Sequence, residues 1–193
     1  MFPPSSSVGV KICGITSAAQ AESIVEAGAD ALGLNFWEKS KRYVPPATAA
    51  GWDLIHRLPT TLVAVLVNPS LEQLAEIVDL KVVHMLQLHG DESPDVCARV
   101  MDLGLPVIKA LQVRDQDSLA TIGDYPCTTI LLDAYCPGAY GGEGKTFPWA
   151  LAIEAMARFP TKQFILAGGL TPENIAEAVG KVHPSAVDVA SGV

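Results

Sequence analysis

Eight short apolar segments recur along the 193-residue chain, and their number constrains its fold more than any other feature. Each segment is rich in valine, isoleucine and leucine, and reads as a continuous apolar run more than as an apolar–polar alternation. Continuous runs are typical of strands buried on both faces of a parallel sheet. The predicted strands cover residues 8–13, 30–36, 61–67, 82–88, 106–112, 128–133, 163–167 and 186–190.

Helix signals lie between several of these strands. Each predicted helix ends at a glycine or begins with a capping residue or a proline: 17–27, 46–57, 70–78, 93–103 and 172–179. Parallel strands joined by helical crossovers form either an open doubly wound sheet or a closed barrel. Eight strands, with no Gly-x-Gly-x-x-Gly motif after the first, favour the α/β fold of a (β/α)8 TIM barrel.

The sequence given ends at Val193, just past the eighth predicted strand, so the barrel is expected to lack its eighth helix. Apolar surface beside the first and seventh helices would then be exposed. We therefore expect a monomer or a weak homodimer. Lys11 and Asp188 lie in the first and eighth strands, which become neighbours only if the sheet closes. We predict that they point inward and pair, because burial of either charge alone would be costly.

Length and composition exclude several classes of protein. A chain of 193 residues that is 49% hydrophobic can bury one sizeable core, so we expect a single domain over residues 1–193. A net charge of −8 argues against partners such as nucleic acid or an anionic membrane. The chain shows no secretory signal or membrane-spanning run, which predicts a cytoplasmic protein. The four cysteines have neither the pairing nor the interleaved histidines of a zinc site, so no metal is expected.

Two reactive side chains stand at predicted strand ends. Cys13 ends the first strand before a glycine turn, and Asp133 ends the sixth. Strand ends of this kind line the active face of a barrel, so the thiol and the carboxylate suggest a proton-transfer pair. The simpler alternatives are a buried, inert thiol for Cys13 and a turn cap for Asp133. The small residues of 166–174 and 187–192 would let backbone amides close on a phosphate.

Six motifs occur in one order and together closely resemble the phosphoribosylanthranilate isomerases of tryptophan biosynthesis, from about residue 8 onward. They are Lys11-Ile-Cys-Gly-Ile-Thr, Ser40-Lys-Arg-Tyr-Val, Gln87-Leu-His-Gly, Asp133 with Gly141-Gly-Glu-Gly-Lys-Thr-Phe-Pro-Trp, Leu166-Ala-Gly-Gly-Leu-Thr-Pro-Glu-Asn and Val187-Asp-Val-Ala-Ser-Gly-Val. The resemblance implies a barrel that converts N-(5-phosphoribosyl)anthranilate into 1-(2-carboxyphenylamino)-1-deoxyribulose 5-phosphate. This Amadori rearrangement uses no cofactor.

The resemblance also implies roles for individual residues. Cys13 matches the family's base and Asp133 its acid, while Arg42 matches the arginine that engages the anthranilate part of the substrate. His89 shares a strand face with Gln87, and either contacts the ligand or makes a structural hydrogen bond. Backbone amides near six small residues are expected to hold the substrate phosphate: Gly142, Gly144, Gly168, Gly169, Ser191 and Gly192.

The sequence departs from the family pattern at three positions. Lys41 replaces a proline, Glu143 a small hydroxyl residue and Ala190 a serine, and the last two changes are expected to weaken phosphate binding. The family continues past Val193 with a glutamate and a helix, so reduced activity is also expected.

Two other functions stay open at this point. One is the sister Amadori isomerase of histidine biosynthesis, which shares the barrel but has an aspartate where Cys13 stands. The other is a C-terminally truncated barrel with little or no activity.

Overall fold

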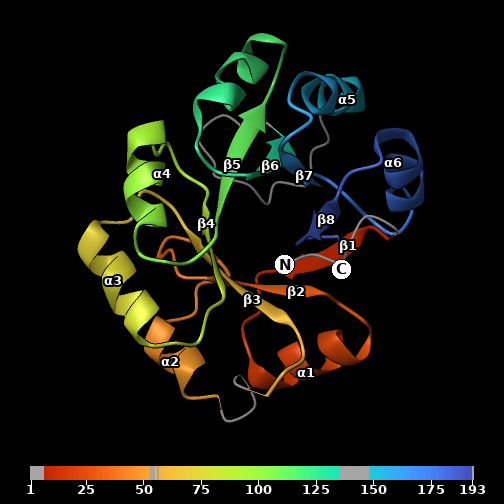
Figure 1. The fold of residues 1–193 in the computed structure, drawn as a ribbon. Coiled ribbons are helices and arrows are strands. Elements are labelled where there is room, and N and C mark those ends of the chain that lie inside the picture. The colour runs from red at the N-terminus through yellow and green to blue at the C-terminus, as the bar shows by residue number, and fades with distance from the viewer. Residues whose placement is uncertain (1–6, 53–54, 56, 135–147, 193) are drawn as a thin grey trace.

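The computed structural model describes residues 7–52, 55, 57–134 and 148–192, and its eight parallel strands form a closed barrel (Figure 1). The strands hydrogen-bond to one another in sequence order, and β1 pairs with β8 to close the sheet. The predicted barrel is therefore confirmed. The strands are β1 (Gly9–Cys13), β2 (Ala31–Asn35), β3 (Thr61–Leu66), β4 (Met85–Leu88), β5 (Val107–Val113), β6 (Thr129–Ala134), β7 (Gln163–Leu166) and β8 (Ala186–Val189).

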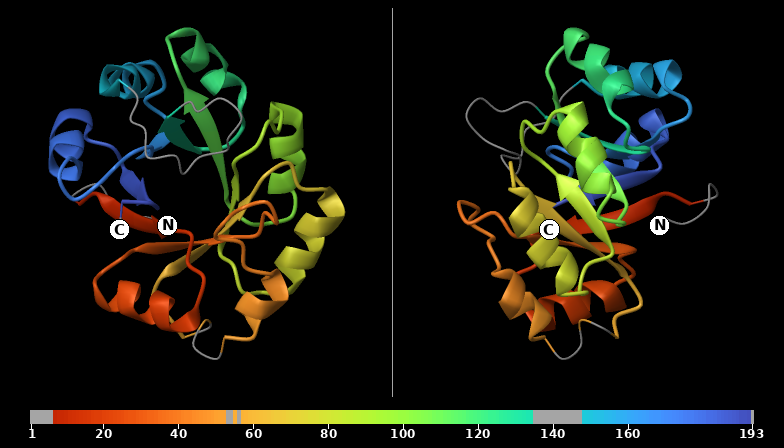
Figure 2. Two further views of the ribbon diagram at one scale, coloured as in Figure 1. Left: turned by 180° about the vertical axis from the view of Figure 1, so that it is seen from behind. Right: turned by 60° about the vertical axis from the view of Figure 1, so that its left-hand side comes forward.

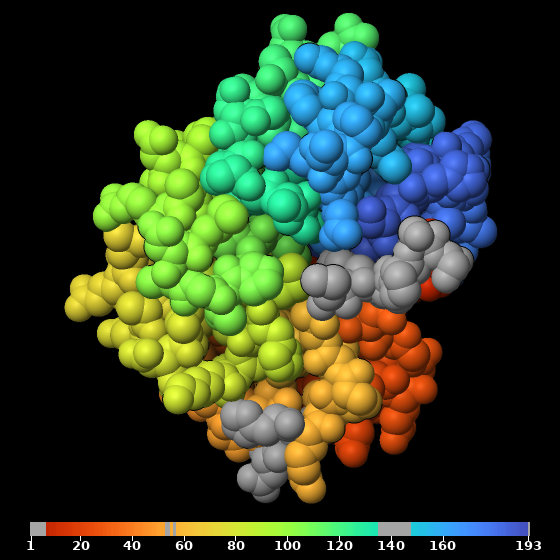
Figure 3. Space-filling view, in the orientation of Figure 1, coloured from red at the N-terminus to blue at the C-terminus, as the bar shows by residue number. Residues whose placement is uncertain are grey.

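Helices surround the strands, as the views from behind and from the side also show (Figure 2). In the space-filling view, consecutive parts of the chain follow one another around the molecule (Figure 3). The helices described are α1 (Ala18–Glu26), α2 (Pro46–Ala50), α3 (Leu71–Asp79), α4 (Pro94–Met101), α5 (Trp149–Arg158) and α6 (Ile175–Val182), and the 3-10 helix η1 (Asp117–Asp124) lies between β5 and β6.

Two helices differ from their predicted bounds by more than two residues at one or both ends. The helix predicted over 46–57 ends already at Ala50, with Gly51 as its C-cap, since glycine is a poor residue for continuing a helix. The helix predicted from residue 172 begins only at Ile175. Asn174 explains the delay, because its side chain accepts a hydrogen bond from the Thr171 amide and donates one to the Gly169 carbonyl. These bonds hold residues 171–174 in a turn.

The buried apolar side chains form two layers. A larger layer lies between the strands and the helices, and a smaller one fills the barrel. The inner layer is made of Ala31, Val63, Met85, Ile108, Ala110, Leu131, Ile165, Ala167 and Ala186. Strand side chains alternate between the two faces, so a residue two positions from an inner one also points inward. This rule places the buried polar residues Gln87, Asp133 and Asp188 inside the barrel, and Lys11 joins them because it stands opposite Ala31 and Asp188 in the strand register.

The junction of β1 and β8 confirms the predicted ion pair. Lys11 stands directly opposite Asp188 in the strand register, and its Nζ lies 2.7 Å from Asp188 Oδ1. Both side chains are almost fully buried. The pairing of two charges 177 positions apart is possible only because the sheet closes.

The outer face of β1 is covered less well than that of its neighbour. Val10 and Ile12 point outward and are partly exposed, whereas Leu32 and Leu34 on β2 are fully buried. Within the residues described, no helix follows β8. Val10 and Ile12 thus leave apolar surface exposed on the outside of β1. Among the helices described, none is long and apolar enough to cross a membrane.

Candidate active site

Cys13 lies at the carboxyl end of β1, on the same strand face as Lys11. Lys11 donates a hydrogen bond of 2.7 Å to Asp188 Oδ1, and its Nζ and the Cys13 thiol both lie against Gly33. Burial raises the pKa of Cys13 to about 11, while the positive charge of Lys11 acts in the opposite direction and lowers it. The ammonium of Lys11 therefore favours the thiolate, which is the form of cysteine that can take up a proton.

Lys11 itself remains charged. Burial lowers its pKa, but the charges of Asp188 and Cys13 more than offset this effect, so the pKa of Lys11 is raised overall. A protonated Lys11 satisfies the Asp188 carboxylate and presents a positive charge to Cys13.

Gly33 makes room for this group of side chains from the neighbouring strand β2. A Cβ atom on Gly33 would lie 2.7 Å from Cys13 Sγ and 3.0 Å from Lys11 Nζ. Any side chain at this position would push against both atoms. Gly33 was not predicted as a site residue, although a glycine inside a strand often marks a place where other groups approach closely.

Asp133 lies at the carboxyl end of β6, almost completely buried. Its Oδ1 accepts a hydrogen bond of 2.8 Å from the Ala134 amide, and its Oδ2 lies 3.1 Å from Nε2 of His89. Gly168 packs closely beside it, because a Cβ atom there would come within 2.9 Å of Asp133 Oδ1. The carboxylate is thus held by partners from β4 and from its own strand.

His89 follows the end of β4, and its ring joins two of the inward-facing residues. Its Nδ1 lies 2.9 Å from the side-chain nitrogen of Gln87, and its Nε2 contacts Asp133. Of the two alternatives for His89, the structural hydrogen bond is present. The sequence showed that Gln87 and His89 share a face, but it gave no signal that this face meets Asp133.

Arg42 comes from the segment after β2 and lies beside the Cys13 strand end. Its side chain packs against Gly14, where a Cβ atom would collide with the Arg42 Cδ atom, and its charge lowers the pKa of Cys13. Gly14 has a φ of +89°, a conformation that glycine adopts without penalty. The structure therefore brings Arg42 and Cys13 together.

The residues expected to bind phosphate are only partly described. Gly168 and Gly169 follow β7 with φ values of 81° and 63°, which turn the backbone sharply beside Asp133. Gly192 packs on the carbonyl of Leu170, so the segments after β7 and β8 touch. Ser191 is exposed next to them. Gly142 and Gly144 lie outside the residues described.

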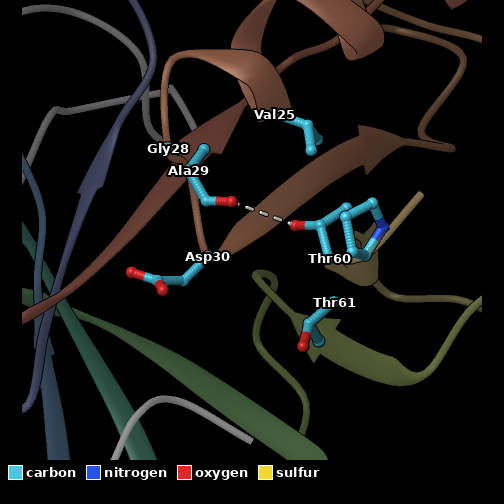
Figure 4. A pocket seen from close by; sticks show the side chains of 7 residues that line it. Val25, Gly28, Ala29, Asp30, Thr60 and Thr61 are labelled. Atoms are coloured by element: carbon cyan, nitrogen blue, oxygen red, sulfur yellow. Dashed lines mark hydrogen bonds between the residues drawn. The ribbon is translucent and has the colours of Figure 1, made fainter.

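A separate pocket of about 540 Å³ opens at the opposite end of the barrel (Figure 4). It is lined by residues before β2 and at the start of β3, including Asp30, Thr60 and Thr61. Asp30 accepts a hydrogen bond from the Val10 amide, and Thr60 donates one to the Ala29 carbonyl. These groups already have partners, and no thiol or imidazole lines the pocket. Over the described part of the chain, no three histidine, cysteine, aspartate or glutamate residues could hold a metal ion.

Comparison with known proteins gives matches over nearly the whole chain. The family model described as N-(5'phosphoribosyl)anthranilate (PRA) isomerase matches residues 10–193. An N-(5'-phosphoribosyl)anthranilate isomerase of Geobacter metallireducens is 50% identical over 188 residues, which are 96% of this chain and 89% of that protein. The protein of the same name from Trichlorobacter lovleyi is 47% identical over 96% of this chain and 88% of its own length.

Solved structures give the same result. The crystal structure of phosphoribosyl anthranilate isomerase from Thermotoga maritima has a TM-score of 0.85 and 38% identity, covering 97% of this chain and 89% of that one. A phosphoribosyl anthranilate isomerase in complex with reduced 1-(o-carboxyphenylamino)-1-deoxyribulose 5-phosphate has a TM-score of 0.82 and 36% identity, with the same coverage. Sequence and structure agree, and the chain belongs to the N-(5'-phosphoribosyl)anthranilate isomerase family.

Proposed function

We propose that Cys13 is the general base and Asp133 the general acid with which this isomerase carries out the Amadori rearrangement of N-(5'-phosphoribosyl)anthranilate in tryptophan biosynthesis. One observation carries the proposal: each group points into the barrel near the carboxyl end of its strand and has its own polar partner. Cys13 has Lys11 on β1, and Asp133 has His89 just after β4. Because β1 and β6 are not neighbours in the barrel, a sugar could lie between the two groups.

The two groups meet the needs of the reaction. Asp133 gives a proton to the ring oxygen as the sugar opens, which leaves an imine at C1. Cys13, as the thiolate, removes the proton from C2 of this protonated imine and leaves an enolamine. The enolamine becomes the ketose as C1 takes up the proton held by Cys13 and the C2 hydroxyl gives its proton to Asp133, which restores both groups. Both steps are general acid–base catalysis by positioned side chains. No atom is lost or gained overall, as an isomerisation requires.

The remaining site residues would hold the two ends of the substrate. The guanidinium of Arg42, half-buried beside Cys13, suits the carboxylate or the ring of the anthranilate part. Backbone amides around Gly168, Gly169 and Gly192 suit the phosphate. Ser191, Gly142 and Gly144 stay predicted phosphate contacts.

The substrate is proposed by analogy with a relative that was solved with a phosphorylated product analogue. The related Thermotoga maritima enzyme is called dimeric in one structure, and for this chain a monomer or weak homodimer stays a prediction, as does a cytoplasmic location. The histidine-pathway isomerase is not proposed, because the family match is to the tryptophan-pathway enzyme and Cys13 is present.

The test is the loss of anthranilate fluorescence as the purified protein turns over freshly made substrate. Turnover by the wild type, and its loss in Cys13→Ala and in Asp133→Asn, would support both roles. We expect each variant to lose at least about 100-fold in kcat, the lower end of what general acid–base groups contribute. Full activity in either folded variant would remove that residue from the mechanism. A folded but inactive wild type would favour the truncated, inactive barrel.

A further inference from the structure

A chain of three side chains, Gln87, His89 and Asp133, runs across the inside of the barrel from β4 to β6. The Gln87 side-chain nitrogen lies 2.9 Å from His89 Nδ1, and His89 Nε2 lies 3.1 Å from Asp133 Oδ2. Gln87 is fully buried, and the side chains of His89 and Asp133 are only 10% and 7% exposed. Water therefore has little access to these bonds, and their donors and acceptors must match one another.

The partners of the two ring nitrogens decide which one carries the hydrogen. An amide nitrogen can only donate, so Nδ1 of His89 must accept from Gln87. The Asp133 carboxyl group has a lone pair on Oδ2 whether or not it holds the proton of a general acid, so Nε2 can donate to it. A neutral imidazole has one donor and one acceptor, and it satisfies both requirements in the Nε2–H form alone.

We propose that Gln87 and His89 are positioning residues for Asp133: Gln87 fixes the Nε2–H form of His89, and His89 in turn fixes the carboxylate. This inference rests on the proposed role of Asp133 as the general acid. The Ala134 amide holds Oδ1 and the His89 ring holds Oδ2, so the carboxylate cannot rotate. Each oxygen keeps a lone pair for the proton that is transferred.

The charged groups around His89 come from three other strands. Asp133 on β6 touches the ring directly, and Asp188 on β8 is close enough for the charge of Asp133 to act on it. Lys11 on β1 neutralises Asp188 through the 2.7 Å ion pair. Gln112 on β5 stands opposite Asp133 in the strand register and is uncharged. The contact from within β4 is the neutral amide of Gln87, and this residue offers the cleanest substitution.

The substitution Gln87→Glu replaces the donor by an acceptor of the same size. A carboxylate next to Nδ1 draws a proton onto that nitrogen, so His89 changes to the doubly protonated form. We expect kcat to fall about 10- to 100-fold, the loss seen when the outer partner that orients a metal-binding histidine is removed. KM should change little, because Gln87 is proposed to contact no substrate. The matched control is Gln73→Glu, since Gln73 closes the capping box of α3 and glutamate serves equally well there.

A second pair of variants asks whether the N–H donor itself matters. His89→Gln can still present an N–H to Asp133, whereas His89→Leu cannot. We expect His89→Gln to keep clearly more kcat than His89→Leu, and its pH–rate profile to keep the limb assigned to Asp133 near the wild-type position. An equal loss in both variants would contradict the positioning role. This pair keeps the proposal testable if Gln87→Glu fails to fold.

The direct test is the side-chain ¹⁵N spectrum of the histidines in the ligand-free wild type, which separates protonated from unprotonated ring nitrogens. We expect His89 to show a protonated Nε2 and an unprotonated Nδ1, and both nitrogens protonated in Gln87→Glu. A protonated Nδ1 with a bare Nε2 in the wild type would overturn the inference, as would a kcat of Gln87→Glu equal to that of Gln73→Glu. The spectrum needs no substrate, so it is independent of the proposed function. Full turnover by Asp133→Asn would refute the function instead.

Discussion

Single residues decide whether the candidate base can work. Cys13 sits in surroundings that favour the neutral thiol, because burial raises its pKa to about 11 from an ordinary 9.0. Lys11 is the main group that acts against this, and it keeps its charge through Asp188. The thiolate needed for proton removal therefore depends on the ammonium of Lys11, which contacts no solvent.

The pH dependence of Cys13 alkylation tests this dependence on Lys11. A thiol reacts as the thiolate, so a raised pKa moves the reaction to higher pH. For the wild type we expect an apparent pKa of about 11, and Lys11→Met should move it further up, because the group that lowers it is gone. The measurement is the rate of iodoacetamide labelling at Cys13, located by mass spectrometry of the modified peptide. A wild-type apparent pKa at or below 9.0 would contradict the account.

Much of the residue-scale chemistry could be predicted from the sequence, but the partners could not. Cys13 and Asp133 stand out because each ends an apolar run, and Lys11 and Asp188 could be paired because they face each other in a closed sheet. The bond between His89 and Asp133 joins residues 44 positions apart on strands that are not adjacent. The length of this bond depends on the width of the barrel and on the orientations of the imidazole ring and of the carboxylate. Strand periodicity determines neither.

At the scale of elements, the segment that carries His89 is fastened to β5 by a buried ion pair. Lys109 Nζ donates to the Gly90 carbonyl at 2.7 Å and to Glu92 Oε2 at 2.8 Å. Glu92 in turn accepts hydrogen bonds from the Gly90 and Asn68 amides. The pair thus holds the backbone immediately after His89 and links it to the segment that follows β3.

Breaking this pair should loosen the His89 segment. Lys109→Met leaves the Glu92 carboxylate buried without its cation, which typically costs about 3–5 kcal/mol of unfolding free energy. We expect the double variant Lys109→Met/Glu92→Gln to recover part of the loss, because the unpaired charge is gone. Urea unfolding gives the free energy of unfolding of the single and the double variant. The control is Lys39→Met, which replaces an exposed lysine. A single variant as stable as that control would show that the pair contributes nothing.

Helix bounds illustrate why elements are harder to predict than their order. The alternation of strands and helices follows from the spacing of apolar runs, and the strands lie close to their predicted positions. The start of α6 depends instead on the two side-chain bonds of Asn174, which compete with the first helical turn. Both bonds reach only three and five residues back along the chain, but proline and capping residues give the same sequence signal for this turn as for a first helical turn.

At the scale of the whole molecule, the closed barrel brings the first and last strands together around Lys11 and Asp188. We expect Lys11→Met to lower the unfolding free energy by about 3–5 kcal/mol, because Asp188 is left buried and unpaired. The double variant Lys11→Met/Asp188→Leu should be more stable than Lys11→Met, since it buries no charge there. Thermal unfolding of the three proteins gives the comparison. A double variant that is less stable than Lys11→Met would show that the ion pair does not determine the stability of the junction.

The claim that two groups flank the sugar is tested most directly by a crystal structure of this protein with reduced 1-(o-carboxyphenylamino)-1-deoxyribulose 5-phosphate. The account predicts Cys13 Sγ and the Asp133 carboxylate on opposite sides of the sugar carbons, Arg42 on the anthranilate part, and the phosphate on the amides near Gly168, Gly169 and Gly192. A ligand that contacts only one of the two groups, or both from the same side, would contradict it.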